Sequence, residues 1–175
     1  MIGQYPDIFT AAVLRNPVIS VGEISISDIP DWYYAEFGLP YPASMTSSPP
    51  PPFMLNTDDD DDSKKNIVQL GMTPDVYQKL YNASPIRYAD KVTADVLLLI
   101  GRDDLRVAPT QGYTYYHTLK ALRHNDEDGI EKGRVEMLVF DGESHPLDGV
   151  QCARVGWEAA KAFFARAAGR GMGSN

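Results

Sequence analysis

Two acids and one histidine stand where catalytic side chains often lie in proteins with parallel sheets. Asp103 and Asp104 follow an apolar run at residues 96–100, and His145 follows a second run at residues 135–140. Such runs predict buried strands of a parallel sheet. Functional groups of these sheets gather just beyond the carboxyl ends of the strands. The three residues are therefore the first candidates for chemistry, the alternative being loop, turn or helix-cap residues.

The chemistry that these residues could perform is proton transfer. Consecutive parallel strands joined by a right-handed helical crossover usually lie side by side, which would bring Asp104 and His145 together. A carboxylate fixes the tautomer of a neighbouring imidazole and stabilises the imidazolium that forms when the ring takes a proton. An acid followed in the chain by a histidine is also the order found in the triad of α/β-hydrolases. We favour Asp104 as the acid, although spacing alone leaves Asp103 as its rival.

A triad also needs a nucleophile, and the G-x-S-x-G motif of the hydrolase elbow does not occur in the sequence. In the usual order the serine would precede the acid, on elements that come before Val13. Cys152 is a poor substitute, because it follows His145 in the predicted final helix and is expected to be a small, buried or half-buried side chain. His117 and His124 are predicted on a helix and in a charged loop, where solvated histidines are common.

The elements that must position these residues alternate between strands and helices. A short buried strand is predicted at residues 11–14, and helices are predicted at residues 73–81, 110–123 and 150–168, with a further helix start at residues 28–34. This alternation predicts an α/β fold with a mostly parallel sheet flanked by helices. The first residues resemble a helix end that leads directly into a central strand. We therefore expect the chain to be a fragment without the earlier strands.

Composition limits the classes of function. The chain has 175 residues with 43% hydrophobic and 23% charged residues, as in one ordinary globular domain. A net charge of -8 argues against nucleic acid or an anionic membrane as partner, because no basic surplus exists to neutralise phosphates. The single cysteine excludes an intrachain disulfide. Without an apolar run of membrane length or a signal-peptide pattern, the predicted location is the cytoplasm.

The domain predicted from these patterns is a partial α/β-hydrolase domain over residues 1–168. It contains a Pro/Asp-rich insertion at about residues 44–66, with four consecutive prolines and five consecutive aspartates. Such a segment cannot bury enough apolar surface to offset its ordering entropy, so we expect a disordered surface loop. Metal binding by the aspartates is the less favoured alternative, and no cofactor or metal is predicted. Residues 169–175 are predicted to form a flexible tail.

Five segments of the chain resemble the C-terminal half of the catalytic domain of acylaminoacyl-peptidases, in the prolyl oligopeptidase family of serine peptidases. They are IGQYPDIFTAAVLRNPV, SDIPDWYYAEFGLPY, SPIRYADKV, LLLIGRDDLRVAPTQGYTYYHTLK and VEMLVFDGESHPL. The combination of DIPDW, SPIRY and the G-x-D-D-x-R-V…QG loop is specific. The chain departs from the family at Leu105, where an arginine is common, at Ala108, where a proline is usual, and in its Pro/Asp-rich insertion.

The resemblance implies that Asp104 is the triad acid and His145 the triad base. It also implies an upstream β-propeller and serine elbow, an N-acylated peptide as substrate, and a possible homo-oligomer of the complete enzyme. The resulting hypothesis is a serine-peptidase domain fragment that is inactive alone. One alternative is a carboxylesterase-like or dienelactone-hydrolase relative, against which DIPDW and SPIRY argue. The other is a non-catalytic truncated paralogue that docks on a partner peptidase subunit through an exposed strand edge.

Overall fold

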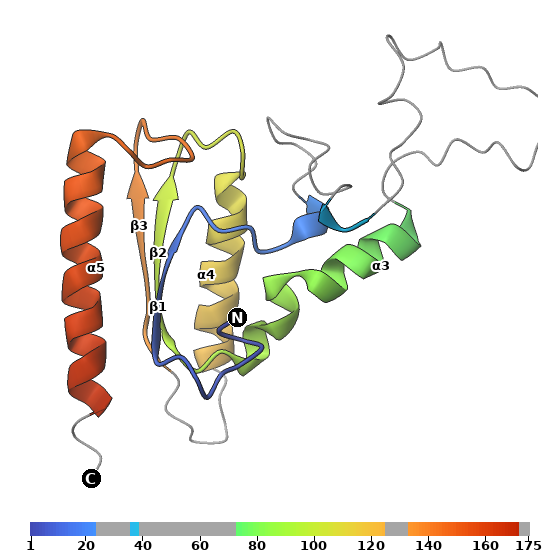
Figure 1. Cartoon of the computed structure of the whole chain (residues 1–175), viewed down its shortest axis with the longest axis horizontal. Helices are drawn as coiled ribbons and strands as arrows, with labels where there is room; N and C mark the ends of the chain where they lie inside the picture. The colour runs from blue at the N-terminus through green and yellow to red at the C-terminus, as the bar shows by residue number, and fades with distance from the viewer. Residues whose placement is uncertain (24–35, 39–72, 125–132, 172–175) are drawn as a thin grey trace, which may run out of the picture.

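A computed structural model of the chain describes residues 1–23, 36–38, 73–124 and 133–171. Its elements are β1 (Ala11–Arg15), η1 (Val21–Glu23), α3 (Pro74–Ala83), η3 (Pro85–Lys91), β2 (Asp95–Gly101), α4 (Pro109–His124), β3 (Val135–Phe140) and α5 (Val150–Gly171). This alternation of strands and helices confirms the predicted α/β class (Figure 1). The predicted helix start at 28–34, the insertion at 44–66 and the last four residues of the tail lie outside the described residues.

The described strands form a parallel sheet in the order β1-β2-β3. In the middle of the sheet Leu98 pairs with Leu14 on one side and with Met137 on the other. Helix α4 covers one face of the sheet and α5 covers the opposite face (Figure 1). The loops that follow β2 and β3 therefore leave the sheet at the same edge, which is the edge where the candidate residues were expected.

Strand β2 forms the centre of the core, and all of its residues are buried. Its side chains alternate between two hydrophobic clusters. Leu98 packs in the cluster that includes Tyr115 and Leu119 of α4. Leu99 packs in the cluster on the α5 side, with Phe163. A strand covered on both faces needs apolar residues at every position, which explains why β2 is the clearest signal in the sequence.

The outer strands differ from the prediction. Strands β1 and β3 were both expected to be buried, but most of their residues are only half-buried. Each of them has a neighbour on one side only in the described sheet, so its side chains have fewer contacts than those of β2. An apolar run thus predicted the strands correctly but did not predict how deeply they lie.

The helices follow their predicted signals closely. Thr73 caps α3, with its Oγ1 accepting a hydrogen bond from the backbone N–H of Val76 at 3.3 Å. Helix α4 extends one residue beyond its predicted range at each end. Helix α5 reaches Gly171, so residues 169–171 are helical where a flexible tail was predicted. The inner face of α5 includes Cys152 and Phe163, which are both buried.

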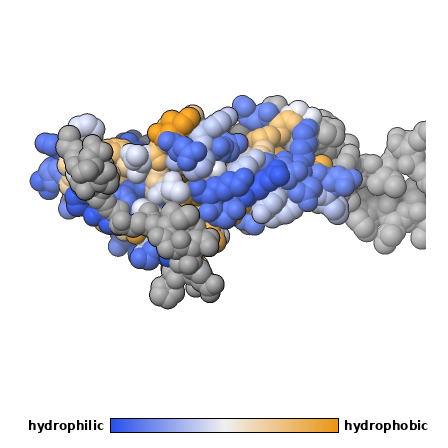
Figure 2. Space-filling view, turned by 90° about the horizontal axis from the view of Figure 1, so that it is seen from below, coloured by the Kyte–Doolittle hydropathy of each residue, from blue (hydrophilic) through white to orange (hydrophobic). Residues whose placement is uncertain are grey.

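One face of the molecule is mostly polar where the described residues form it. Hydrophilic residues dominate the face seen from below, and the hydrophobic patches on it are separate (Figure 2). On α5 the side chain of Trp157 is 73% exposed. None of the helices in the described part of the chain combines the length and apolar character needed to span a bilayer.

The core predicts a clear effect of truncating β2. Leu98 is 0% exposed, and we expect the substitution Leu98→Ala to lower the free energy of unfolding by about 2–5 kcal/mol because it leaves a cavity between the sheet and α4. Urea unfolding followed by circular dichroism measures this change. The matched control is Leu105→Ala, at a leucine that is 77% exposed, which should change the same free energy by less than about 0.5 kcal/mol. Equal effects of the two substitutions would contradict the assignment of β2 to the core.

Candidate active site

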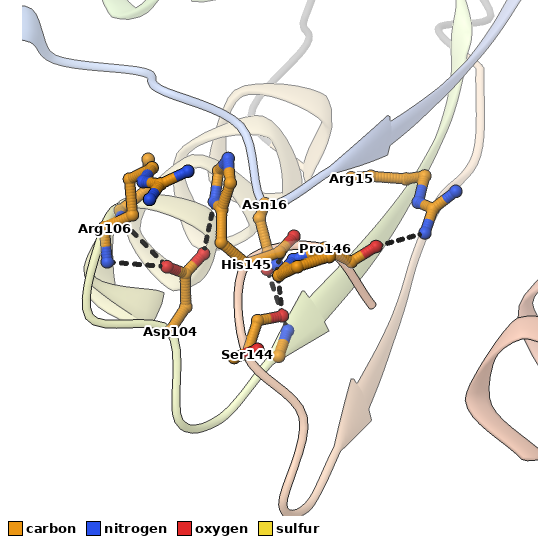
Figure 3. Close-up of polar contacts among 9 residues, drawn as sticks. Arg15, Asn16, Asp104, Arg106, Ser144, His145 and Pro146 are labelled. Carbon is orange, nitrogen blue, oxygen red and sulfur yellow. Dashed lines mark hydrogen bonds and ion pairs between the residues drawn. The ribbon is translucent and has the colours of Figure 1, made fainter. Parts of the chain in front are cut away.

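Asp104 and His145 meet at the carboxyl edge of the sheet. The Nδ1 atom of His145 lies 2.8 Å from the Oδ2 atom of Asp104 (Figure 3). The acid comes from the loop after β2 and the histidine from the loop after β3, which are neighbouring strands. The predicted juxtaposition of the two side chains is therefore present in the structure.

Asp104 is held in place on its other side by backbone donors. Its Oδ1 atom accepts hydrogen bonds from the N–H groups of Arg106 and Val107, at 2.8 and 2.9 Å. Its side chain is fully buried. A buried carboxylate needs such donors because its desolvation is otherwise costly. The carboxylate thus has a fixed orientation toward the histidine.

The geometry also separates Asp104 from its rival. Asp103 is exposed, and it contributes to this region through its backbone, whose N–H donates to the carbonyl oxygen of Glu143 at 3.0 Å. Adjacent residues in a loop point in different directions, so one of two neighbouring acids can be buried while the other remains in solvent. The structure therefore places Asp104, and not Asp103, against His145.

His145 has one ring nitrogen engaged and keeps part of its surface accessible. Its side chain is 34% exposed. When the Nδ1–H of a neutral imidazole donates to a carboxylate, the lone pair resides on Nε2. That atom can accept a proton from a hydroxyl group that approaches it, as in nucleophilic catalysis. The pair can therefore act as a general base whose tautomer is set by Asp104.

Two further residues build the site, and the sequence analysis missed both. The Nδ2 group of Asn16 donates to the carbonyl oxygens of Ser144 and His145, at 3.2 and 3.0 Å (Figure 3). Arg15 donates to the next two carbonyl oxygens along the loop, from residues 146 and 147, at 2.7 and 3.1 Å. Both residues stand at the carboxyl end of β1. Their position directly after an apolar run is the sequence signal for them, because polar side chains at the carboxyl end of a strand also mark Asp104 and His145.

The end of β2 and the loop after β3 approach each other very closely. A Cβ atom on Gly101 would lie 2.6 Å from the carbonyl oxygen of Glu143 and 2.8 Å from that of Ser144. Glycine is the residue that permits such a backbone approach. Gly142 adopts a φ of 74°, which turns the chain sharply after β3. These glycines allow the loop that carries His145 to fold back over the end of β2.

The remaining candidates do not join the pair. Cys152 is buried, as expected, and desolvation by burial raises the pKa of its thiol, with a further rise from the Glu143 carboxylate. A thiol of this kind is a weak nucleophile at neutral pH. His117 is exposed on α4, beside the ring of Tyr116. His124 is the last residue of α4, so its predicted place in the following loop is wrong.

Potential metal ligands do not cluster in the described ranges. No group of three or more histidine, cysteine or acidic side chains there is arranged to hold a metal ion. The five consecutive aspartates, for which a metal site was the less favoured alternative, lie outside these ranges.

The Asp104–His145 contact predicts a defined imidazole tautomer. In the neutral form of the wild-type ring, we expect the proton of His145 to reside on Nδ1, because this atom lies against the Asp104 carboxylate. The substitution Asp104→Asn should shift this proton toward Nε2, because the charged acceptor is lost. Nitrogen-15 NMR of the ring measures the tautomer. Asp103→Asn is the control and should leave the tautomer unchanged. If Asp103→Asn shifts the tautomer and Asp104→Asn does not, the assignment of Asp104 as the partner of His145 is wrong.

Comparison with known proteins identifies the sequence family. Residues 47–171 match the model of the prolyl oligopeptidase family. Over 152 residues the chain is 32% identical to the acylamino-acid-releasing enzyme of Mus musculus, an alignment that covers 86% of this chain and 16% of that protein. Over 149 residues it is 32% identical to the enzyme of the same name from Arabidopsis thaliana, covering 85% of this chain and 15% of that protein. The chain thus spans about a sixth of the length of these relatives, and the resemblance noted from the motifs is confirmed.

Solved structures agree with the fold. The crystal structure of puromycin hydrolase superposes with a TM-score of 0.59 at 15% identity, covering 93% of this chain and 19% of that chain. The acylaminoacyl peptidase of Pyrococcus horikoshii superposes with a TM-score of 0.50 at 21% identity, covering 83% of this chain and 17% of that chain. At these identities the likeness concerns the fold, which is that of the α/β-hydrolase peptidases. Together with the sequence match, these findings show that the chain belongs to the prolyl oligopeptidase family.

Proposed function

We propose that this chain supplies the acid–histidine pair of a serine peptidase that releases N-acylated amino acids from blocked peptides. The observation that carries the proposal is the 2.8 Å contact between His145 Nδ1 and Asp104 Oδ2 at adjacent strand ends. In the proposed enzyme the nucleophile is a serine outside residues 1–175, because the sequence contains no elbow motif.

The proposed reaction assigns one step to each group. The serine hydroxyl attacks the peptide carbonyl while Nε2 of His145 takes its proton. His145 then gives this proton to the leaving amine as the peptide bond breaks, which leaves the acyl group on the serine. Water then attacks the acyl-enzyme while Nε2 of His145 takes a proton from it. His145 gives this proton to the serine oxygen as the bond between the serine and the acyl group breaks. Asp104 keeps the ring in the required tautomer and stabilises its charged form throughout.

The proposed substrate class depends on the relatives. Those that match most of this chain are acylamino-acid-releasing enzymes, although the chain covers about 16% of their length. The Asp104–His145 pair itself is compatible with peptide or ester hydrolysis, because both pass through the same kind of acyl-enzyme. The substrate is therefore the part of the proposal that rests on family membership, whereas the acid–base role rests on geometry.

A non-catalytic docking module is the second candidate. The observation that favours it is the position of β1, which has a hydrogen-bonded neighbour on one side only within the described sheet. Such an edge offers backbone groups for pairing with another chain. On this alternative the chain would bind a partner peptidase subunit through β1, and Asp104 and His145 would have no role in turnover.

The decisive assay uses the longer polypeptide that the proposal requires, with this sequence joined to its serine-bearing segment. We expect hydrolysis of an N-acetylated peptide in preference to the same peptide with a free amino group and to a simple ester. His145→Gln should lower kcat/KM by at least about 1,000-fold, because the base is lost. His117→Gln, at an exposed histidine on α4, is the matched control and should leave kcat/KM unchanged.

Each contrary result has a distinct meaning. A preference for the simple ester would replace the peptidase assignment with an esterase. Undiminished turnover in His145→Gln would favour the docking module. Clear turnover by residues 1–175 alone that survives His145→Gln would overturn the proposed division of the active site.

A further inference from the structure

We propose that Arg15 and Asn16 form a clamp that positions the histidine loop, so that three strand ends, and not two, build the acid–histidine pair. The clamp is defined as the side chains of these two residues, and the histidine loop as residues 144–147. The proposal rests on the proposed function for the role of His145 as base. Arg15 and Asn16 are positioning residues, since their contacts are with the backbone of the loop.

The clamp holds four consecutive carbonyl groups. Asn16 donates to those of residues 144 and 145, and Arg15 donates to those of residues 146 and 147, at distances between 2.7 and 3.2 Å. The two sets of donors come from adjacent residues that lie about 130 positions earlier in the chain. Because the bonds join main-chain atoms of the loop, they restrain its path directly and thereby the place from which the His145 ring projects.

Asn16 also connects the loop to β2. Its Oδ1 atom accepts a hydrogen bond from the N–H of Gly101 at 2.8 Å, and its own N–H donates to the carbonyl of Leu99 at 2.9 Å. Its side chain is therefore bonded to the strand that leads to Asp104 on one side and to the histidine loop on the other. The residue is 5% exposed, so water cannot easily replace these contacts.

The chemistry of Asn16 fits this place closely. Its φ of 39° lies in the left-handed region, which asparagine tolerates better than most residues. Only a side-chain amide offers both donors and an acceptor at this length. An aspartate could keep the bond from Gly101 but could not donate to the two carbonyl groups of the loop.

The histidine loop has a need for external restraint. Leu147 adopts a φ of 52°, a strained conformation for a leucine, while its side chain is 2% exposed in the cluster under α5. Such a conformation persists only when the surroundings determine it. The burial of Leu147 and the clamp therefore act together, since one fixes the side chain and the other fixes the carbonyl groups beside it.

The test measures the ring proton of His145 in the chain of residues 1–175. We expect Arg15→Met and Asn16→Gly to increase the exchange rate of the Nδ1 proton by about 10-fold or more and to mix the tautomers. Asn16→Asp should act like Asn16→Gly, although it keeps the acceptor for Gly101. Nitrogen-15 NMR reports the exchange rate of the Nδ1 proton and the tautomer of the ring. The signal is assigned to His145 by its loss in His145→Gln.

Two controls separate positioning from stability. Arg87→Met removes another exposed arginine that donates to a backbone carbonyl, that of Asn82. Ser84→Ala removes a buried hydroxyl that bonds the backbone of Val21 and Leu80, so it lowers stability away from the site. Both variants should leave the tautomer and the exchange rate of the His145 proton as in the wild type.

The proposal is overturned if Arg15→Met leaves the His145 proton unchanged, or if Ser84→Ala alters it as much as the clamp variants do. Arg15 is exposed, so Arg15→Met decides the question even where a substitution of Asn16 prevents folding. If the clamp variants alter the His145 proton but the peptidase assay fails, the proposed function is wrong and the clamp stands. If the peptidase assay succeeds but the clamp variants leave the His145 proton unchanged, the clamp is wrong and the proposed function stands.

Discussion

The organisation of the site depends on one buried carboxylate that must be satisfied by hydrogen bonds. Asp104 has no solvent-exposed side-chain surface, and its two oxygens accept from two backbone N–H groups and contact the imidazole of His145. A buried carboxylate without such partners would be strongly destabilised. The turn after β2 and the loop after β3 are therefore constrained to deliver their donors to the same point.

The parallel sheet makes this delivery possible. All three described strands point the same way, so the segments that follow them leave at one edge. Strand β2 supplies the acid, β3 supplies the histidine, and β1 supplies Arg15 and Asn16, which bond the histidine loop. Packing beneath the site, where Leu147 is buried under α5, links the same loop to the core. The functional geometry is thus a consequence of strand order and of close approach at Gly101.

Features encoded by neighbouring residues could be predicted from the sequence. The apolar run of β2, the Thr-Pro start of α3 and the order of acid and histidine all depend on local patterns. The meeting of Asp104 with His145 followed from one general rule, that consecutive parallel strands joined by a helix lie side by side. Spacing favoured Asp104 without excluding Asp103, and the family resemblance implied Asp104. The structure gives the physical reason in the turn formed around the Asp104 carboxylate.

Features set by distant contacts could not be predicted in the same way. The half-buried state of β1 and β3 depends on their places in the sheet, which no apolar run reveals. The bonds from Arg15 to residues 146 and 147 join positions about 130 residues apart, and nothing in the adjacent sequence specifies them. The end of α5 was predicted too early because residues 169–175 are rich in glycine, whereas the helix continues to Gly171.

The central claim, a direct interaction between Asp104 and His145, is tested most directly by a double-mutant cycle on the free energy of unfolding. Asp104→Asn and His145→Gln, measured singly and together by urea unfolding, should show a coupling energy of about 1–2 kcal/mol. The parallel cycle with Asp103→Asn should show coupling below about 0.5 kcal/mol. A coupling energy below about 0.5 kcal/mol in the Asp104 cycle would contradict the direct interaction. A coupling energy in the Asp103 cycle larger than that in the Asp104 cycle would contradict it as well.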